Sequence, residues 1–174
     1  MLCVVKNNIK QAILLAILLT AVSFNCNAQR VAVSTNAIYW GMLSPNLSIE
    51  LGLSRHSSVS LEASALPWNI NDKFSIAHIS VVPEYKYWFT MPFYGHYTGV
   101  NALYSSYQRV KDSVEKTGNI VALGVSYGYA FIINKRWNIV PHIAIGGGID
   151  FSSGKREFVF VPTKAGINLQ MVIK

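Results

Sequence analysis

The chain has 174 residues, with fifteen basic and eight acidic side chains, a formal net charge of +7 and 51% hydrophobic residues. Its two cysteines and four widely spaced histidines show neither a disulfide framework nor the spacing of zinc ligands. We therefore expect no cofactor, no metal and no disulfide-stapled module.

Residues 1–28 have the three parts of a secretory signal peptide. Lys6 and Lys10 supply positive charge, and residues 12–24 form an apolar run of thirteen residues. Small residues at the two positions that signal peptidase reads predict cleavage after Ala28. A transmembrane anchor is the alternative, but the run is short for one.

The predicted mature domain, 29–174, carries neither Cys3 nor Cys26, and so has no thiolate ligand or nucleophile. A lipidated Cys26 is an alternative that the residues before it fit poorly. Removing the leader leaves thirteen basic and eight acidic residues, a net charge of +5. A basic exported domain can meet anionic lipid headgroups or lipopolysaccharide phosphates, and we expect no nucleic-acid partner.

Apolar and polar side chains alternate with period two along the mature chain, and turn signals recur about every ten residues. The pattern predicts eight strands, at 30–39, 46–54, 58–68, 76–88, 96–107, 119–131, 137–150 and 157–173. Charged or polar loops are predicted at 108–118 and 151–156. The sequence shows no helical periodicity after the leader.

The large apolar face of these strands opposes a face of small or polar residues, which is typical of strands that meet lipid on one side. Aromatic residues gather at both strand ends, as an interfacial girdle requires. One group comprises Tyr85, Tyr87, Trp88, Phe89, Phe93, Tyr94, Tyr129, Phe131 and Trp137, and the other comprises Tyr39, Trp40, Trp68, Tyr104, Tyr107, Phe151, Phe158 and Phe160. The predicted fold is all-β: an eight-stranded antiparallel up-and-down transmembrane β-barrel after a cleaved signal peptide. A soluble lipocalin-like barrel is the alternative.

Several segments, in matching order, resemble one protein family over nearly all of the mature chain. They are STNAIYW, PNLSIELGLS, VVPEYKYWF, GVSYGYAFIINKRWNI and PTKAGINLQMVIK. The family comprises small outer-membrane β-barrels of Bacteroidales-type bacteria and is catalogued as domain of unknown function 3575. The resemblance implies an eight-stranded barrel in the outer membrane, and it supplies no activity or catalytic residues.

Strand alternation directs a set of ionisable side chains into the barrel. The predicted lumen charge network comprises Glu50, Glu62, Glu84, Lys86, His142 and Lys164, with Asn36 and Asn168 beside it. An eight-stranded barrel is just wide enough to be filled by side chains, so these charges have to pair. We expect a salt-bridge plug; a proton- or ion-conducting path is the alternative.

Basic residues also cluster in the predicted outer loops. Arg109, Lys111, Lys116, Lys155 and Arg156 are candidate contacts to lipopolysaccharide phosphates on the outer rim. Acidic neighbours partly cancel this charge, so an ordinary solvated loop is the alternative. The glycine run at 146–148 is not a phosphate loop, because no helix start follows it; bending or close packing is expected there.

No nucleophile elbow or triad motif is present in the sequence, so we expect a protein that is not an enzyme. The predicted function is a structural, envelope-integrity or surface-assembly role in the outer membrane of a Gram-negative bacterium, with a plugged lumen. Its expected partners are outer-membrane lipid, lipopolysaccharide and envelope or fimbrial proteins, and a monomer is expected. The alternatives are a lipid A-modifying enzyme and a soluble periplasmic ligand carrier.

Overall fold

The computed structural model describes residues 30–66, 74–111, 114–152 and 155–173, so the predicted signal peptide lies outside the described part. The described elements are β1 (Val31–Asn36), α2 (Ala37–Gly41), β2 (Asn46–Gly52), β3 (Ser57–Leu66), β4 (Phe74–Trp88), β5 (Gly95–Lys111), β6 (Val114–Ile132), β7 (Trp137–Ser152) and β8 (Lys155–Val172).

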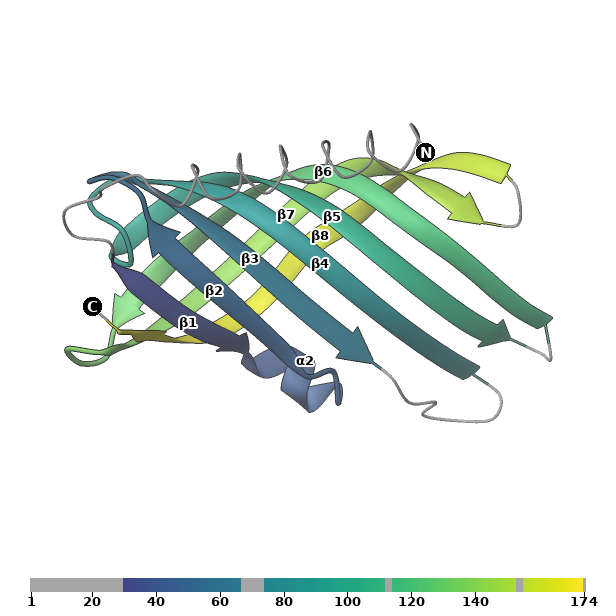
Figure 1. The fold of residues 1–174 in the computed structure, drawn as a ribbon, viewed down its shortest axis with the longest axis horizontal. Helices are drawn as coiled ribbons and strands as arrows, with labels where there is room; N and C mark the ends of the chain where they lie inside the picture. Colours follow the sequence, from purple (N-terminus) through teal and green to yellow (C-terminus); the bar gives the residue numbers. More distant parts are fainter. Residues whose placement is uncertain (1–29, 67–73, 112–113, 153–154, 174) are drawn as a thin grey trace, which may run out of the picture.

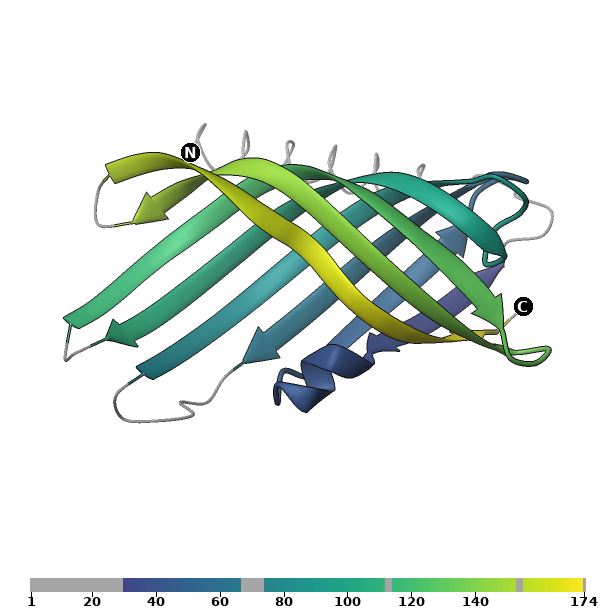
Figure 2. The ribbon, with the colours of Figure 1, turned by 180° about the vertical axis from the view of Figure 1, so that it is seen from behind.

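Each strand pairs antiparallel with the next along the chain, and β8 returns to pair with β1, which closes the ring (Figures 1 and 2). The closing ladder is short and runs from the pair Ala32–Val172 to the pair Asn36–Asn168. The predicted all-β, antiparallel, up-and-down order of eight strands is confirmed.

The two ends of the barrel differ. Three tight turns, at 53–56, 89–94 and 133–136, lie at one end together with the start of β1 and the end of β8, and we call it the short-turn end (Figure 1). The opposite, loop end is uneven, because β4 to β8 continue beyond the last pair of β3 with β4, Leu66 with His78.

The structure corrects the predicted boundaries at the loop end. Most of the predicted loops 108–118 and 151–156 belong to strands, because backbone pairing continues out to Lys111–Val114 and Ser152–Lys155. Strand pairing uses backbone hydrogen bonds alone. Charged side chains at a hairpin tip therefore interrupt the alternation of apolar and polar residues, but they do not prevent the strands from pairing.

The first strand is shorter than the predicted 30–39, because the chain turns into α2 after Asn36. The Asn36 side chain caps this helix by accepting a hydrogen bond from the Ile38 amide at 3.1 Å. The same carboxamide accepts from the Ile167 amide at 3.3 Å and donates to the Ala165 carbonyl at 3.1 Å. It therefore takes the place of a strand residue beside β8 where β1 ends.

The interior is polar and the outside is apolar. Of the described residues, twenty buried ones are polar or charged and ten are hydrophobic, whereas thirty-five large hydrophobic side chains are exposed. The β2 strand shows the rule, since its burial alternates without exception and Glu50 points inward between the outward Ile49 and Leu51. Among the described residues, no helix is long and apolar enough to cross a membrane.

The glycine run in β7 permits close packing of β7 on β6. A Cβ built on Gly146 would overlap the Leu123 carbonyl oxygen and lie 2.7 Å from the Gly124 Cα, and both are backbone atoms that cannot rotate away. We expect Gly146→Ala to lower the free energy of unfolding by about 1–3 kcal/mol, as overpacking does. Urea unfolding in detergent micelles, followed by gel mobility, measures this.

The control for this variant is Gly41→Ala in α2, where a Cβ would have no atom within 4 Å. Its unfolding free energy should stay close to that of the unmodified chain. Equal stability of the Gly146→Ala and Gly41→Ala variants would contradict the close approach of β6 and β7.

Candidate functional site: a charge network in the barrel lumen

Five ionised side chains form a line of alternating charge across the lumen. Lys86 Nζ lies 2.6 Å from Glu50 Oε2 and 3.8 Å from Glu84 Oε2. Lys164 Nζ lies 2.9 Å from Glu84 Oε2 and 3.0 Å from Glu62 Oε2. Glu84 thus stands between the two ammonium groups and joins β2, β3, β4 and β8 through them.

Serine and amide groups donate further hydrogen bonds to Glu50 and Glu84, whereas Glu62 Oε2 has only its ion pair with Lys164. Ser58 donates to Glu50 Oε1 at 2.6 Å, and Gln170 donates to Glu50 Oε2 at 3.3 Å. Ser126 donates to Glu84 Oε1 at 2.5 Å. Buried carboxylates are tolerated when they are paired and hydrogen-bonded in this way, so Glu50 and Glu84 can stay ionised inside the lumen.

An apolar plug closes the short-turn end beneath the charges. Trp88, Phe93 and Tyr97 are almost fully buried, with the indole of Trp88 4.8 Å from the Tyr97 ring and 6.1 Å from the Phe93 ring. The two layers are joined, because Trp88 Nε1 donates to Ser58 Oγ at 2.8 Å and Lys86 Nζ lies 4.8 Å above the Tyr97 ring.

The turn at 89–94 folds inward to complete this plug. Phe93 has a φ of 69°, in the left-handed region, which costs a non-glycine residue about 1–2 kcal/mol. Burial of its ring stabilises the fold by about 1.5–3 kcal/mol. The Asn138 side chain also donates to the Phe93 carbonyl at 2.9 Å. Burial of the ring and this hydrogen bond together stabilise the inward conformation of the turn.

On the loop side of the charges, α2 places Tyr39 close to the network. Burial raises the pKa of the Tyr39 hydroxyl above 10, and the negative charge of Glu62 raises it further. Asn101 on β5 and Thr163 on β8 are also buried, and their side-chain polar atoms have no hydrogen-bond partner. Thr163 is the extra, unpaired residue of a β-bulge in β8. On either side of it, Lys164 pairs with Ala144 and Pro162 pairs with Ile145 of β7.

The structure brings together five of the six residues predicted for the lumen network, Glu50, Glu62, Glu84, Lys86 and Lys164, and leaves out His142. This ring is buried, but its Nδ1 lies 3.2 Å from the Val140 carbonyl of its own strand, and its Nε2 has no partner. The two lysines already occupy the carboxylates, which leaves no anion for a protonated imidazole. Asn168 is also buried and contacts Ser34, at 3.5 Å.

The predicted outer-rim residues all belong to β5, β6 and β8 at the loop end. Arg156 is exposed, with its guanidinium 5.7 Å from the Phe151 ring. The side chains of Arg109, Lys111, Lys116 and Lys155 lie outside the described part, although the backbones of Arg109 and Lys116 pair directly. Lipopolysaccharide binding by this set stays a prediction.

The described side chains form no arrangement typical of a catalytic or metal site. Within the described ranges, no three His, Cys, Asp or Glu side chains converge as metal ligands do. In the same ranges no hydrogen bond joins a serine to a histidine ring, and Ser126 instead donates to Glu84. Of the histidines, His56 contacts the Trp88 carbonyl and His96 contacts Tyr127.

Several aromatic residues that were predicted in the interfacial belts lie inward instead. Tyr39 lies close to the lumen network, and Tyr107 donates to Asp150 Oδ2 at 2.7 Å. Trp88 and Phe93 were predicted in an interfacial belt, and both are buried in the lumen plug. The signal for Trp88 was available, because it has the same strand parity as Glu84 and Lys86. Phe93 lies in a turn, where parity says nothing.

The fold and the lumen define a closed eight-stranded β-structure with an ion-paired interior. The chain belongs to the family described as protein of unknown function (DUF3575), whose model matches residues 13–173. No curated protein and no solved structure matches the chain. The family resemblance predicted from sequence is therefore confirmed, and the Bacteroidales origin stays a prediction.

Removal of one ammonium group tests whether the network stabilises the fold. Lys164→Met leaves Glu62 and Glu84 without their closest cation, so we expect the free energy of unfolding to fall by about 3–5 kcal/mol. Adding Glu62→Gln to this variant should recover part of the loss. Urea unfolding in detergent micelles gives the free energy of unfolding of the unmodified chain, the Lys164→Met variant and the double variant.

The matched control is Arg156→Met, which removes an exposed cation at the loop end and should change stability by less than about 0.5–1 kcal/mol. If Lys164→Met cost no more than Arg156→Met, the ion pairs of the lumen could not be holding β8 to β3 and β4.

Proposed function

We propose that the chain is a small integral outer-membrane β-barrel protein with a plugged lumen and a structural, envelope-integrity or surface-assembly role. The observation that carries this proposal is the inverted distribution of side chains, with ion pairs inside and a continuous apolar wall outside. A protein surrounded by water does not expose so large an apolar surface, whereas a barrel in lipid requires one.

The outward wall carries no charge along most of its height. Among the described side chains, every Asp, Glu, Lys and Arg lies in the lumen, in a turn at the short-turn end, before β1, or near the loop-end tips of β7 and β8. Outward positions between these levels carry residues such as Leu61, Val100, Leu123 and Ile145, which are 54–71% exposed. Such an apolar band matches the hydrocarbon layer of a bilayer.

Aromatic side chains flank this band and support the same proposal. Tyr87, Phe89, Phe131 and Trp137 are exposed near the short-turn end, and Tyr104, Phe151, Phe158 and Phe160 are exposed toward the loop end. Aromatic rings of this kind favour the interface between acyl chains and water. The signal peptide predicted at 1–28 supports export, and the tight turns at one end support a periplasmic short-turn end.

The lumen supports a structural role over transport or catalysis. An open pore needs a continuous water path, but ion pairs cross the middle of this barrel and Trp88, Phe93 and Tyr97 fill the short-turn end. A soluble carrier needs an apolar cavity, and the described interior is polar above this plug. We therefore propose that the protein is not an enzyme and acts through its surfaces.

Cell fractionation tests the location. The full chain, expressed in a Gram-negative host, should be found in the outer-membrane fraction and should change its gel mobility on heating, as folded barrels in detergent do. Recovery of the protein only from the soluble periplasmic fraction would overturn the proposal and favour a soluble carrier.

A charged substitution on the outer wall tests whether this wall faces lipid or water. Leu123 lies at the middle of β6 and is 71% exposed. Leu123→Lys should destabilise the folded protein in vesicles by about 2–4 kcal/mol if this wall meets lipid, and should be nearly neutral if it meets water. Thr117→Lys, at an exposed position toward the loop end of β6, is the control and should be nearly neutral in both cases.

A further inference from the structure

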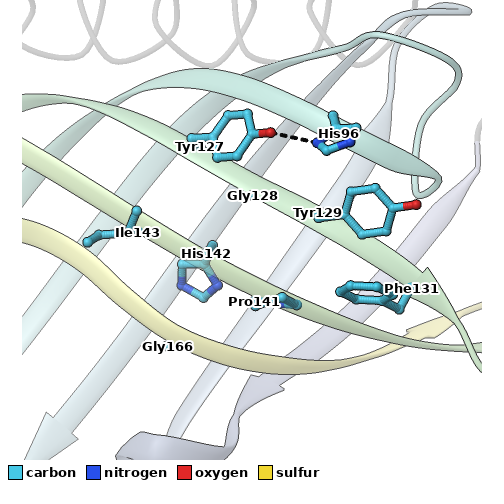
Figure 3. A pocket seen from close by; sticks show the side chains of 9 residues that line it. All are labelled: His96, Tyr127, Gly128, Tyr129, Phe131, Pro141, His142, Ile143 and Gly166. Atoms are coloured by element: carbon cyan, nitrogen blue, oxygen red, sulfur yellow. Dashed lines mark hydrogen bonds between the residues drawn. The ribbon is translucent and has the colours of Figure 1, made fainter.

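A groove of about 630 Å³ lies on the outer wall across β6 and β7, near the short-turn end (Figure 3). Its sides are apolar and aromatic, and its floor is formed by Gly128, His142 and Gly166. The side chains that Gly128 and Gly166 lack would point into the lumen, where Tyr97 and Asn36 occupy the space, so both glycines line the groove with backbone alone. The remaining lining residues are His96, Tyr127, Tyr129, Phe131, Pro141 and Ile143.

The groove contains one polar pair among its apolar residues. The Tyr127 hydroxyl and His96 Nδ1 lie 2.6 Å apart, and both residues are exposed (Figure 3). If Tyr127 donates to a neutral His96, the Nε2–H of the ring is left as a free donor; if Nδ1–H donates, the Tyr127 hydroxyl hydrogen is left free. In either tautomer the pair offers one hydrogen-bond donor to an occupant.

The short-turn end beside this groove has a uniform charge. Arg30, Arg55, Lys135 and Arg136 are exposed there, and none of the described acidic side chains lies at that end. Lys135 and Arg136 belong to the turn at 133–136 that joins β6 to β7, the two strands that form the walls of the groove. A ligand that extends beyond Phe131 at the end of the groove therefore approaches this turn, whose Lys135 also lines a second hollow with Arg30 and Phe93.

We infer that the groove binds one anionic glycerophospholipid, with its glycerol region against Tyr129 and Phe131, an acyl chain against Ile143, and the phosphate toward Lys135 and Arg136. The donor of the His96–Tyr127 pair then has an acceptor in a glycerol ester carbonyl. Each part of the lipid meets its chemical complement, since basic residues attract anionic headgroups and aromatic rings favour the interface. The inference rests on the proposed membrane location and adds a specific lipid site to it.

Photo-crosslinking in vesicles tests the site. The full chain is reconstituted into phosphatidylcholine vesicles that contain a minor fraction of phosphatidylglycerol carrying a diazirine on one acyl chain. Mass spectrometry of peptides then locates the crosslinks. We expect residues 127–131 and 141–143 to be labelled at least five-fold more than residues 47–51, which lie on β2 in the opposite wall.

Two variants test the recognition. Lys135→Gln combined with Arg136→Gln should reduce labelling of the groove by roughly five-fold or more, since one basic residue beside an anionic bilayer contributes about that factor. His96→Ala should also reduce it, because the ester carbonyl loses its oriented donor. The control is Arg55→Gln, in the turn of the opposite wall, which should leave labelling of the groove unchanged.

Failure of this inference can be distinguished from failure of the membrane proposal. Equal labelling of both walls, or groove labelling that survives the double variant, would overturn the lipid site while the protein still resides in the vesicles. A protein that stays in solution and is not labelled on either wall would overturn the membrane location itself.

Discussion

The whole structure depends on one constraint, namely that successive side chains of a β-strand point to opposite faces. In a closed ring these faces become a lumen and an outer wall, so the alternation that sends Ile49 and Leu51 outward also sends Glu50 inward. Once carboxylates are in the lumen, cations have to accompany them, and Lys86 and Lys164 do so. The plug and the apolar wall are therefore two results of the same pattern.

Charge balance explains why the lumen is ordered as it is. Glu84 contacts both lysines, and the remaining carboxylates each contact one, so like charges are separated by an opposite charge along the line Glu50, Lys86, Glu84, Lys164, Glu62. Because these residues come from strands that are not all neighbours in the ring, the line braces the barrel across its lumen as well as around its wall. This supports a rigid scaffold that acts through its surfaces over a conduit.

The strand order and the inward direction of the charged residues could be predicted from the sequence because they follow from the alternation of side chains along each strand. The pairing of each lysine could not, since it depends on which side chains meet across the lumen. The end of β1 was not predicted because the Asn36 side chain makes the hydrogen bonds to β8 that a further strand residue would make with its backbone. A single side chain of this kind leaves no periodic pattern in the sequence. Phe93 was misplaced because its burial depends on an inward-folded turn, and the groove around His96 arises from packing between strands.

Contact of the outer wall with lipid is the central claim, and depth-resolved quenching tests it most directly. In the full chain with Cys3 and Cys26 replaced by serine, single cysteines at successive positions 121–126 of β6 would carry a fluorophore in vesicles of brominated lipid. The account predicts strong quenching at the outward positions Val121, Leu123 and Val125 and weak quenching at the inward Ala122, Gly124 and Ser126. Weak quenching at all six positions would contradict it.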